Sequence, residues 1–144
     1  MISELNIKTD LYKLLNKSAL ISVLNGGGVF KENRPNDSVY NDIVINVNSL
    51  QSKYSTGVSF GLANINIYSK ALQVDNSVSP VDSLFLENTF NKLIEILEPY
   101  KNTSTDFYTY NDFNFSISNT QVFNELQKNE WFYLNIALNV QNNN

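Results

Sequence analysis

Two pairs of closely spaced carboxylates are the residues whose types could carry out acid-base chemistry. Glu95 and Glu98 form one pair, and Asp106 and Asp112 form the other. General acid-base catalysis needs carboxylates that converge in a cleft and have displaced pKa values. We expect Glu95 and Glu98 instead to solvate the outer face of a helix, so neither pair predicts an active site.

Histidine and cysteine are both absent from the sequence. Their absence excludes Ser-His-Asp and Cys-His catalysis, disulfides and sulfur-ligated metal sites. We therefore expect a protein that is not an enzyme and that has no cofactor and no metal.

Three consecutive glycines, Gly26, Gly27 and Gly28, are the nearest approach to a phosphate-binding loop. Such a loop requires a lysine followed by serine or threonine and then a helix, whereas a strand-like segment follows here. We therefore expect a turn at these glycines.

Two segments are candidate contacts with partner proteins. Arg34 is the one arginine in the chain, and its planar donor fork would suit a carboxylate across an interface, although we favour a solvated loop residue. A predicted hairpin tip contains Lys53, Tyr54, Ser55 and Thr56. This tip is equally consistent with a loop that orders on a partner and with an ordinary turn.

A cluster of aromatic residues could form a binding surface for protein or sugar. It contains Tyr108, Tyr110, Phe113 and Phe115. Because half of a strand's side chains face the core, we expect Phe113 and Phe115 to be core residues, while Tyr108 and Tyr110 stay open as interface candidates.

The composition predicts one globular domain spanning residues 1–144, with a frayed tail at about 141–144. The chain is 42% hydrophobic and 17% charged, and its net charge is −4. Lysines are scattered along it, so we expect no tight binding to nucleic acid, whose affinity depends on phosphate neutralisation. No apolar run is long enough to span a membrane, and the N-terminal segment does not read as a signal peptide, so we expect synthesis to end in the cytoplasm.

Hydrophobic periodicity predicts an α+β fold, a mostly antiparallel β-sheet with two main helices packed on one face. The first helix is expected to begin at an N-cap formed by Thr9 or Asp10, and the second at Asp82 or Ser83. The predicted strands cover residues 29–32, 43–50, 58–69, 107–110, 113–118, 121–125 and 131–140.

The order of these elements resembles the tail-completion or tail-terminator proteins of tailed bacteriophages and related head-to-tail connector proteins. The resemblance rests on the helix around Leu11-Tyr12-Lys13-Leu14-Leu15, on Gly-Gly-Gly-Val-Phe-Lys-Glu-Asn-Arg-Pro at 26–35 and on Asp-Ile-Val-Ile-Asn-Val at 42–47. It continues through Leu93-Ile94-Glu95-Ile96-Leu97 and a terminal strand at 131–140.

This resemblance implies a structural virion protein made in the host cytoplasm. It implies a homo-oligomeric ring, a hexamer or a dodecamer, that contacts portal or neck proteins and tail tube proteins while DNA passes through its channel. The alternative from the residues alone is a carbohydrate- or peptide-binding module that uses Tyr108 and Tyr110.

Overall fold

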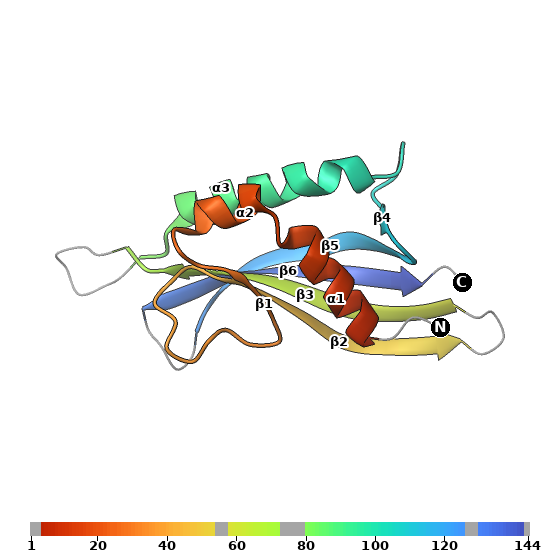
Figure 1. The fold of residues 1–144 in the computed structure, drawn as a ribbon, viewed down its shortest axis with the longest axis horizontal. Coiled ribbons are helices and arrows are strands. Elements are labelled where there is room, and N and C mark those ends of the chain that lie inside the picture. Colours follow the sequence, from red (N-terminus) through yellow and green to blue (C-terminus); the bar gives the residue numbers. More distant parts are fainter. Residues whose placement is uncertain (1–3, 54–57, 73–79, 126–129, 143–144) are drawn as a thin grey trace.

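The computed structural model describes residues 4–53, 58–72, 80–125 and 130–142. They form the predicted α+β fold, a curled six-stranded sheet with two main helices (Figure 1). The helical elements are α1 (Glu4–Leu15), α2 (Ser18–Ile21), η1 (Ser22–Leu24), α3 (Ser83–Leu97) and η2 (Glu98–Tyr100). The strands are β1 (Val29–Lys31), β2 (Ile43–Lys53), β3 (Val58–Lys70), β4 (Tyr108–Tyr110), β5 (Phe113–Asn124) and β6 (Trp131–Asn142).

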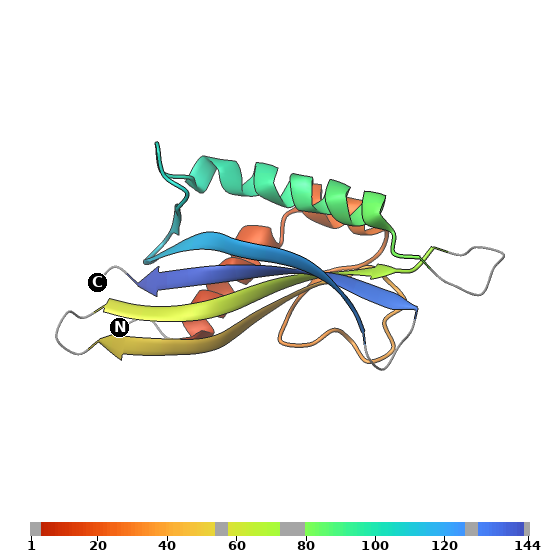
Figure 2. The same ribbon diagram turned by 180° about the vertical axis from the view of Figure 1, so that it is seen from behind.

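The strands lie in the order β1-β2-β3-β6-β5-β4. Strand β1 pairs parallel to β2, and every other neighbouring pair is antiparallel. The three long central pairs, β2 with β3, β3 with β6 and β6 with β5, make up most of the sheet, as both ribbon views show (Figures 1 and 2). The short strands β1 and β4 flank it.

Helices α1 and α3 pack on the same face of the sheet and enclose the core. Alternate residues of the central strands point toward them, and the apolar stripes of the helices complete the cluster. Fully buried members are Ile7, Leu11, Leu14, Leu15, Ile43, Ile45, Ile65, Ile67, Leu93, Leu97, Phe113, Phe115, Ile136 and Leu138. None of the helices within the described ranges is long and apolar enough to cross a membrane.

The start of α1 differs from the expected position. The helix begins at Glu4, so Thr9 and Asp10 lie inside it rather than at its N-cap. Ile7 is fully buried together with Leu11, one turn later, and this apolar stripe extends the helix past the polar capping signal. The expected cap of α3 is present, because Asp82 accepts a hydrogen bond from the backbone N–H of Phe85 at 3.1 Å.

Several strand ends also differ. The segments predicted at 113–118 and 121–125 are one strand, β5, because a bulge between Ile117 and Asn119 shifts the side-chain alternation. Strand β1 ends at Lys31, and β6 continues through Asn142, past the predicted end at residue 140. Only residues 143 and 144 of the expected frayed tail lie outside the described ranges.

Candidate functional site

Arg34 joins the loop between β1 and β2 to the sheet. Its Nε donates to Asp42 Oδ2 at 3.1 Å, and its Nη2 donates to the carbonyl of Tyr40 at 2.7 Å. The guanidinium lies over the rings of Tyr68 and Trp131, at 4.5 and 4.1 Å from their centroids. Its side chain is 9% exposed, so the expected solvated loop residue is wrong: stacking and ion pairing within the chain hold Arg34.

Asp42 is the buried carboxylate that pairs with the Arg34 guanidinium. Its Oδ1 accepts the backbone N–H of Gly28 at 3.0 Å, and its Oδ2 also accepts the hydroxyl of Ser38. Since the carboxylate is 1% exposed, these bonds and the Arg34 pair replace the water it lost on folding. The loop is thereby held at both ends.

The turn at Gly26–Gly28 is bonded to the same Asp42 carboxylate and is not a phosphate loop. A Cβ on Gly27 would lie 1.6 Å from the backbone oxygen of Asn41, so only glycine permits the chain to pass there. Gly26 adopts φ +99°, a conformation that other residues rarely take. The N–H of Gly28 is already bonded to Asp42, which confirms the turn interpretation.

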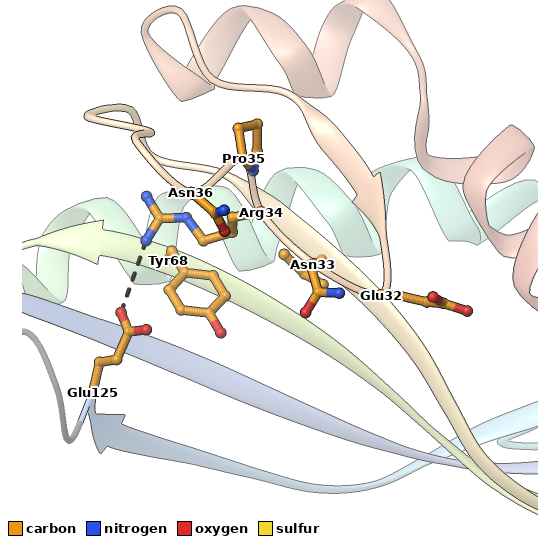
Figure 3. Close-up of a pocket in the computed structure, with 8 residues that line it drawn as sticks. Glu32, Asn33, Arg34, Pro35, Asn36, Tyr68 and Glu125 are labelled. Atoms are coloured by element: carbon orange, nitrogen blue, oxygen red, sulfur yellow. Dashed lines mark ion pairs between the residues drawn. The ribbon is translucent and has the colours of Figure 1, made fainter.

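Beside Arg34 lies a pocket of about 480 Å³ (Figure 3). It is open and polar, and Glu125 sits across it with Oε2 3.9 Å from Arg34 Nη1. That oxygen has no hydrogen-bond partner within the described part of the chain. The lining residues are Glu32, Asn33, Arg34, Pro35, Asn36, Val44, Tyr68 and Glu125.

Two titratable groups of the pocket, Glu32 and Tyr68, have shifted pKa values. A hydrogen bond from Lys8 and its positive charge lower the pKa of Glu32, the opposite of the shift that a general acid needs. Burial raises the pKa of Tyr68, which keeps its phenol protonated. Both shifts move the pKa away from neutral, whereas acid-base catalysis needs a pKa near the working pH.

The backbone at Glu32 is unusual. Its φ is +73°, and the N–H of Asn33 donates to the carbonyl of Lys31 at 2.9 Å across it, which forms a γ-turn of a rare, strained type. The N–H of Glu32 donates to Ile45, so the turn is tied to β2 and ends β1 at this point.

The predicted carboxylate pairs are not brought into a cleft. Glu95 and Glu98 are exposed, as expected for an outer helix face, and Glu95 pairs with Lys92 at 2.8 Å. Asp106 and Asp112 are exposed as well. No group of three acidic side chains suited to a metal ion occurs among the residues described.

The aromatic cluster belongs mainly to the core. Phe113 and Phe115 are fully buried, which confirms their predicted role. Tyr108 is 7% exposed and stacks on Phe115 with ring centroids 5.2 Å apart, and Tyr110 is half-buried with its ring edge-on to Tyr100. A carbohydrate platform needs exposed ring faces, so burial of Tyr108 removes half of the predicted binding surface.

The hairpin tip lies at the edge of what the structure describes. Lys53 is the last residue of β2, and Tyr54, Ser55 and Thr56 lie outside the described residues. Their predicted role in partner contact stays a prediction.

Sequence reasoning missed a set of asparagine and aromatic side chains on the face of the sheet opposite the helices. Asn135 donates from Nδ2 to Asn64 and Asn66, at 3.0 and 2.7 Å, and so links β6 to β3. Toward one end, Tyr133 packs between Tyr68 and Phe123 with centroid distances of 5.1 and 5.4 Å. The alternation of polar and apolar side chains along each strand was the signal for this surface. It identifies one shared surface only after the order of the strands is known.

No protein-family model matches the sequence, and no curated protein matches it. Among solved structures, the fold is similar to a chain of the "Virion of native gene transfer agent (GTA) particle". The TM-score is 0.62 at 9% sequence identity, and the match covers 94% of this chain and 93% of that chain.

At this identity, the likeness establishes the fold, which the two chains share over nearly their whole lengths. The match therefore extends beyond the central sheet.

Proposed function

We propose that this protein is a structural subunit of a phage-like virion and forms a ring at the junction of head and tail. The observation that carries the proposal is the likeness of fold to a virion chain of a gene transfer agent, over 94% of this chain. The position at the junction is supported by the element order, which resembles that of tail-terminator and connector proteins. In this role the protein binds other proteins and catalyses nothing.

The proposed partners are further copies of the chain and the components on either side. Six or twelve copies form the ring, portal or neck proteins contact one side, and tail tube proteins contact the other. The subunit is made in the host cytoplasm and becomes part of the virion. DNA crosses the ring without being held by it.

The charges of the chain support this passive relation to DNA. The sequence has 14 acidic and 10 basic residues, so its net charge disfavours adsorption of a polyanion. Arg34, whose guanidinium would be the best phosphate ligand, is engaged with Asp42 and stacked between two rings. Phosphate binding would have to break these contacts.

Deletion of the gene in a cell that produces the particle tests the function. The expected result is separate heads and tails by electron microscopy, with joined particles restored by the wild-type gene in trans. Purified protein should have a solution mass six or twelve times the 16.4 kDa of one chain. Normal, joined particles from the deletion strain would contradict the proposal.

A further inference from the structure

The two outermost long strands lack neighbours over most of their lengths. Strand β1 pairs with β2 only opposite Ile43–Ile45, and β4 pairs with β5 only opposite Phe113–Phe115. Within the described ranges, β2 at residues 46–53 and β5 at residues 116–124 therefore have no strand on their outer sides. Such edges present rows of backbone N–H and C=O groups that can pair with another strand.

Proline and clustered charge, two features that commonly prevent such pairing, are absent from both edges. Residues 46–53 and 116–124 contain no proline and no acidic residue, and Lys53 is their one charge. Residues 118–124 are all exposed. The β5 edge is therefore open to another strand, and in the described ranges no strand lies outside β2 at 46–53.

An apolar groove of about 230 Å³ lies along the β5 edge. Phe90 and Leu86 of α3 line it on one side, and Val122 and Leu134 line it on the other. Val122 is 44% exposed. An added strand could therefore bury apolar side chains here as well as form backbone hydrogen bonds.

Each edge also contains a bulge, at Val47/Ser49 in β2 and at Ile117/Asn119 in β5. A bulge bends its strand, and bending is required when a sheet closes on itself. Beyond the bulges, regular pairing continues over 49–53 and 119–124, which are edges of similar length.

We propose that the β5 edge of one subunit pairs with the β2 edge of a second copy of this chain, head to tail around the ring. This inference rests on the proposed ring function. Strands β2, β3, β6 and β5 are successively antiparallel, so β5 runs opposite to β2. In a ring the neighbouring sheet keeps its strand direction, and the new pair is antiparallel like the central pairs.

The two edges are different surfaces, which is the requirement for a closed ring. A contact between unlike patches leaves the growing chain of subunits with one free patch of each kind, at its two ends, until the ring closes. Pairing of β5 with another β5 would instead use like patches and stop at a dimer. The short strands cover opposite ends of the two edges, so the neighbours are staggered, as in the closure of a barrel.

The hydrogen-bond pattern identifies which backbone groups face outward. The backbone N–H of Glu125 donates to the carbonyl of Trp131, which is in β6. Along an antiparallel strand, successive N–H groups point alternately toward and away from the partner strand. The N–H of Thr120, five residues earlier, therefore points away from β6. The N–H of Tyr68 donates to Asp42, and the same alternation along β3 leaves the N–H of Ser52 pointing away from β3. Proline at either position removes an outward donor without breaking the sheet.

The test compares Thr120→Pro and Ser52→Pro with the matched controls Thr120→Ala and Ser52→Ala, by light scattering over a concentration series. Circular dichroism and the thermal midpoint verify that each variant is folded. We expect wild type and both alanine variants to form the ring and both proline variants to remain at 16.4 kDa. An equimolar mixture of the two proline variants should give a one-to-one dimer, because each retains the edge that the other lacks.

The outcomes separate the edge pairing from the ring. Rings formed by both folded proline variants would overturn the edge pairing and leave the ring function intact. Open-ended wild-type chains that both prolines disperse would support the edge pairing and contradict the closed ring. A Ser52→Pro protein that dimerises by itself, or a wild type that stays monomeric with no complex in the mixture, would overturn head-to-tail pairing.

Discussion

Arg34 Nε lies 3.1 Å from Asp42 Oδ2, and the two side chains are only 9% and 2% exposed. Each charge depends on the other because little water reaches either. The pair joins the loop after β1 to the residue that precedes β2, and Arg34 also lies 3.9 Å from Glu125 at the end of β5. One side chain thus contacts segments at opposite edges of the sheet.

Replacement of Arg34 by alanine should lower the free energy of unfolding by about 3–5 kcal/mol, the usual cost of leaving one member of a buried pair uncompensated. The stacking on Tyr68 and Trp131 is lost in the same change. Urea unfolding followed by tryptophan fluorescence measures the loss, since Trp131 is the single tryptophan.

Arg34→Lys provides the matched comparison, because it keeps the charge but loses the planar fork and its stacking. The free energy of unfolding of Arg34→Lys should lie between those of wild type and Arg34→Ala. If Arg34→Ala unfolds at the wild-type urea concentration, the pair does not hold the loop.

Gly27→Ala should destabilise the fold more than Gly28→Ala. A Cβ at position 27 would lie 1.6 Å from the backbone oxygen of Asn41, whereas one at position 28 meets only the ring of Phe30 at 3.3 Å. We expect the first change to cost about 1–3 kcal/mol or more, as overpacking does, and the second to be milder. Thermal unfolding of the two variants side by side measures the difference, and equal midpoints would contradict it.

The central sheet could be predicted from sequence because its strands alternate strongly. Ile43 and Ile45 are fully buried as the period-2 pattern requires. The continuity of β5 could not be predicted from sequence. The bulge after Ile117 reverses which residues face the core, so that one strand has the pattern of two. The parallel pairing of β1 was equally hidden, since three residues carry too little pattern to identify a partner.

The surroundings of Arg34 show why the site was harder to predict than the fold. Its burial depends on Tyr68 in β3 and Trp131 in β6, which are distant in sequence and meet it only because those strands are neighbours. No local rule distinguishes such an arginine from a solvated one. Tyr108 was undecided for a similar reason, because β4 is too short to show which face it buries.

The ion pair of Lys8 with Glu32 should make stability depend on acidity. The hydrogen bond and charge of Lys8 lower the pKa of Glu32 below its ordinary 4.5. A carboxyl group whose pKa is lower in the folded state stabilises the fold at any pH above its unfolded-state pKa. This contribution is lost as the pH falls through the folded-state pKa. Glu32→Gln should therefore lower the thermal midpoint slightly at pH 7, and the difference from wild type should shrink progressively as the pH falls below about 4.5.

Lys8→Met supplies the control for this effect. In that background Glu32→Gln should change the midpoint little at any pH, since the partner is gone. A difference between wild type and Glu32→Gln that persists unchanged to about pH 3 would show that the ion pair is not its source.

Two leucines of α3 provide a test of how the helix is held on the sheet. Leu93 is fully buried, whereas Leu84, in the first turn, is 69% exposed. Leu93→Ala leaves a cavity among packed side chains and should cost about 2–5 kcal/mol, while Leu84→Ala should change stability by less than about 0.5 kcal/mol. Urea unfolding of both variants measures this contrast; similar losses would mean that α3 presents a different face to the sheet, and the groove beside β5 would then be lined by other residues.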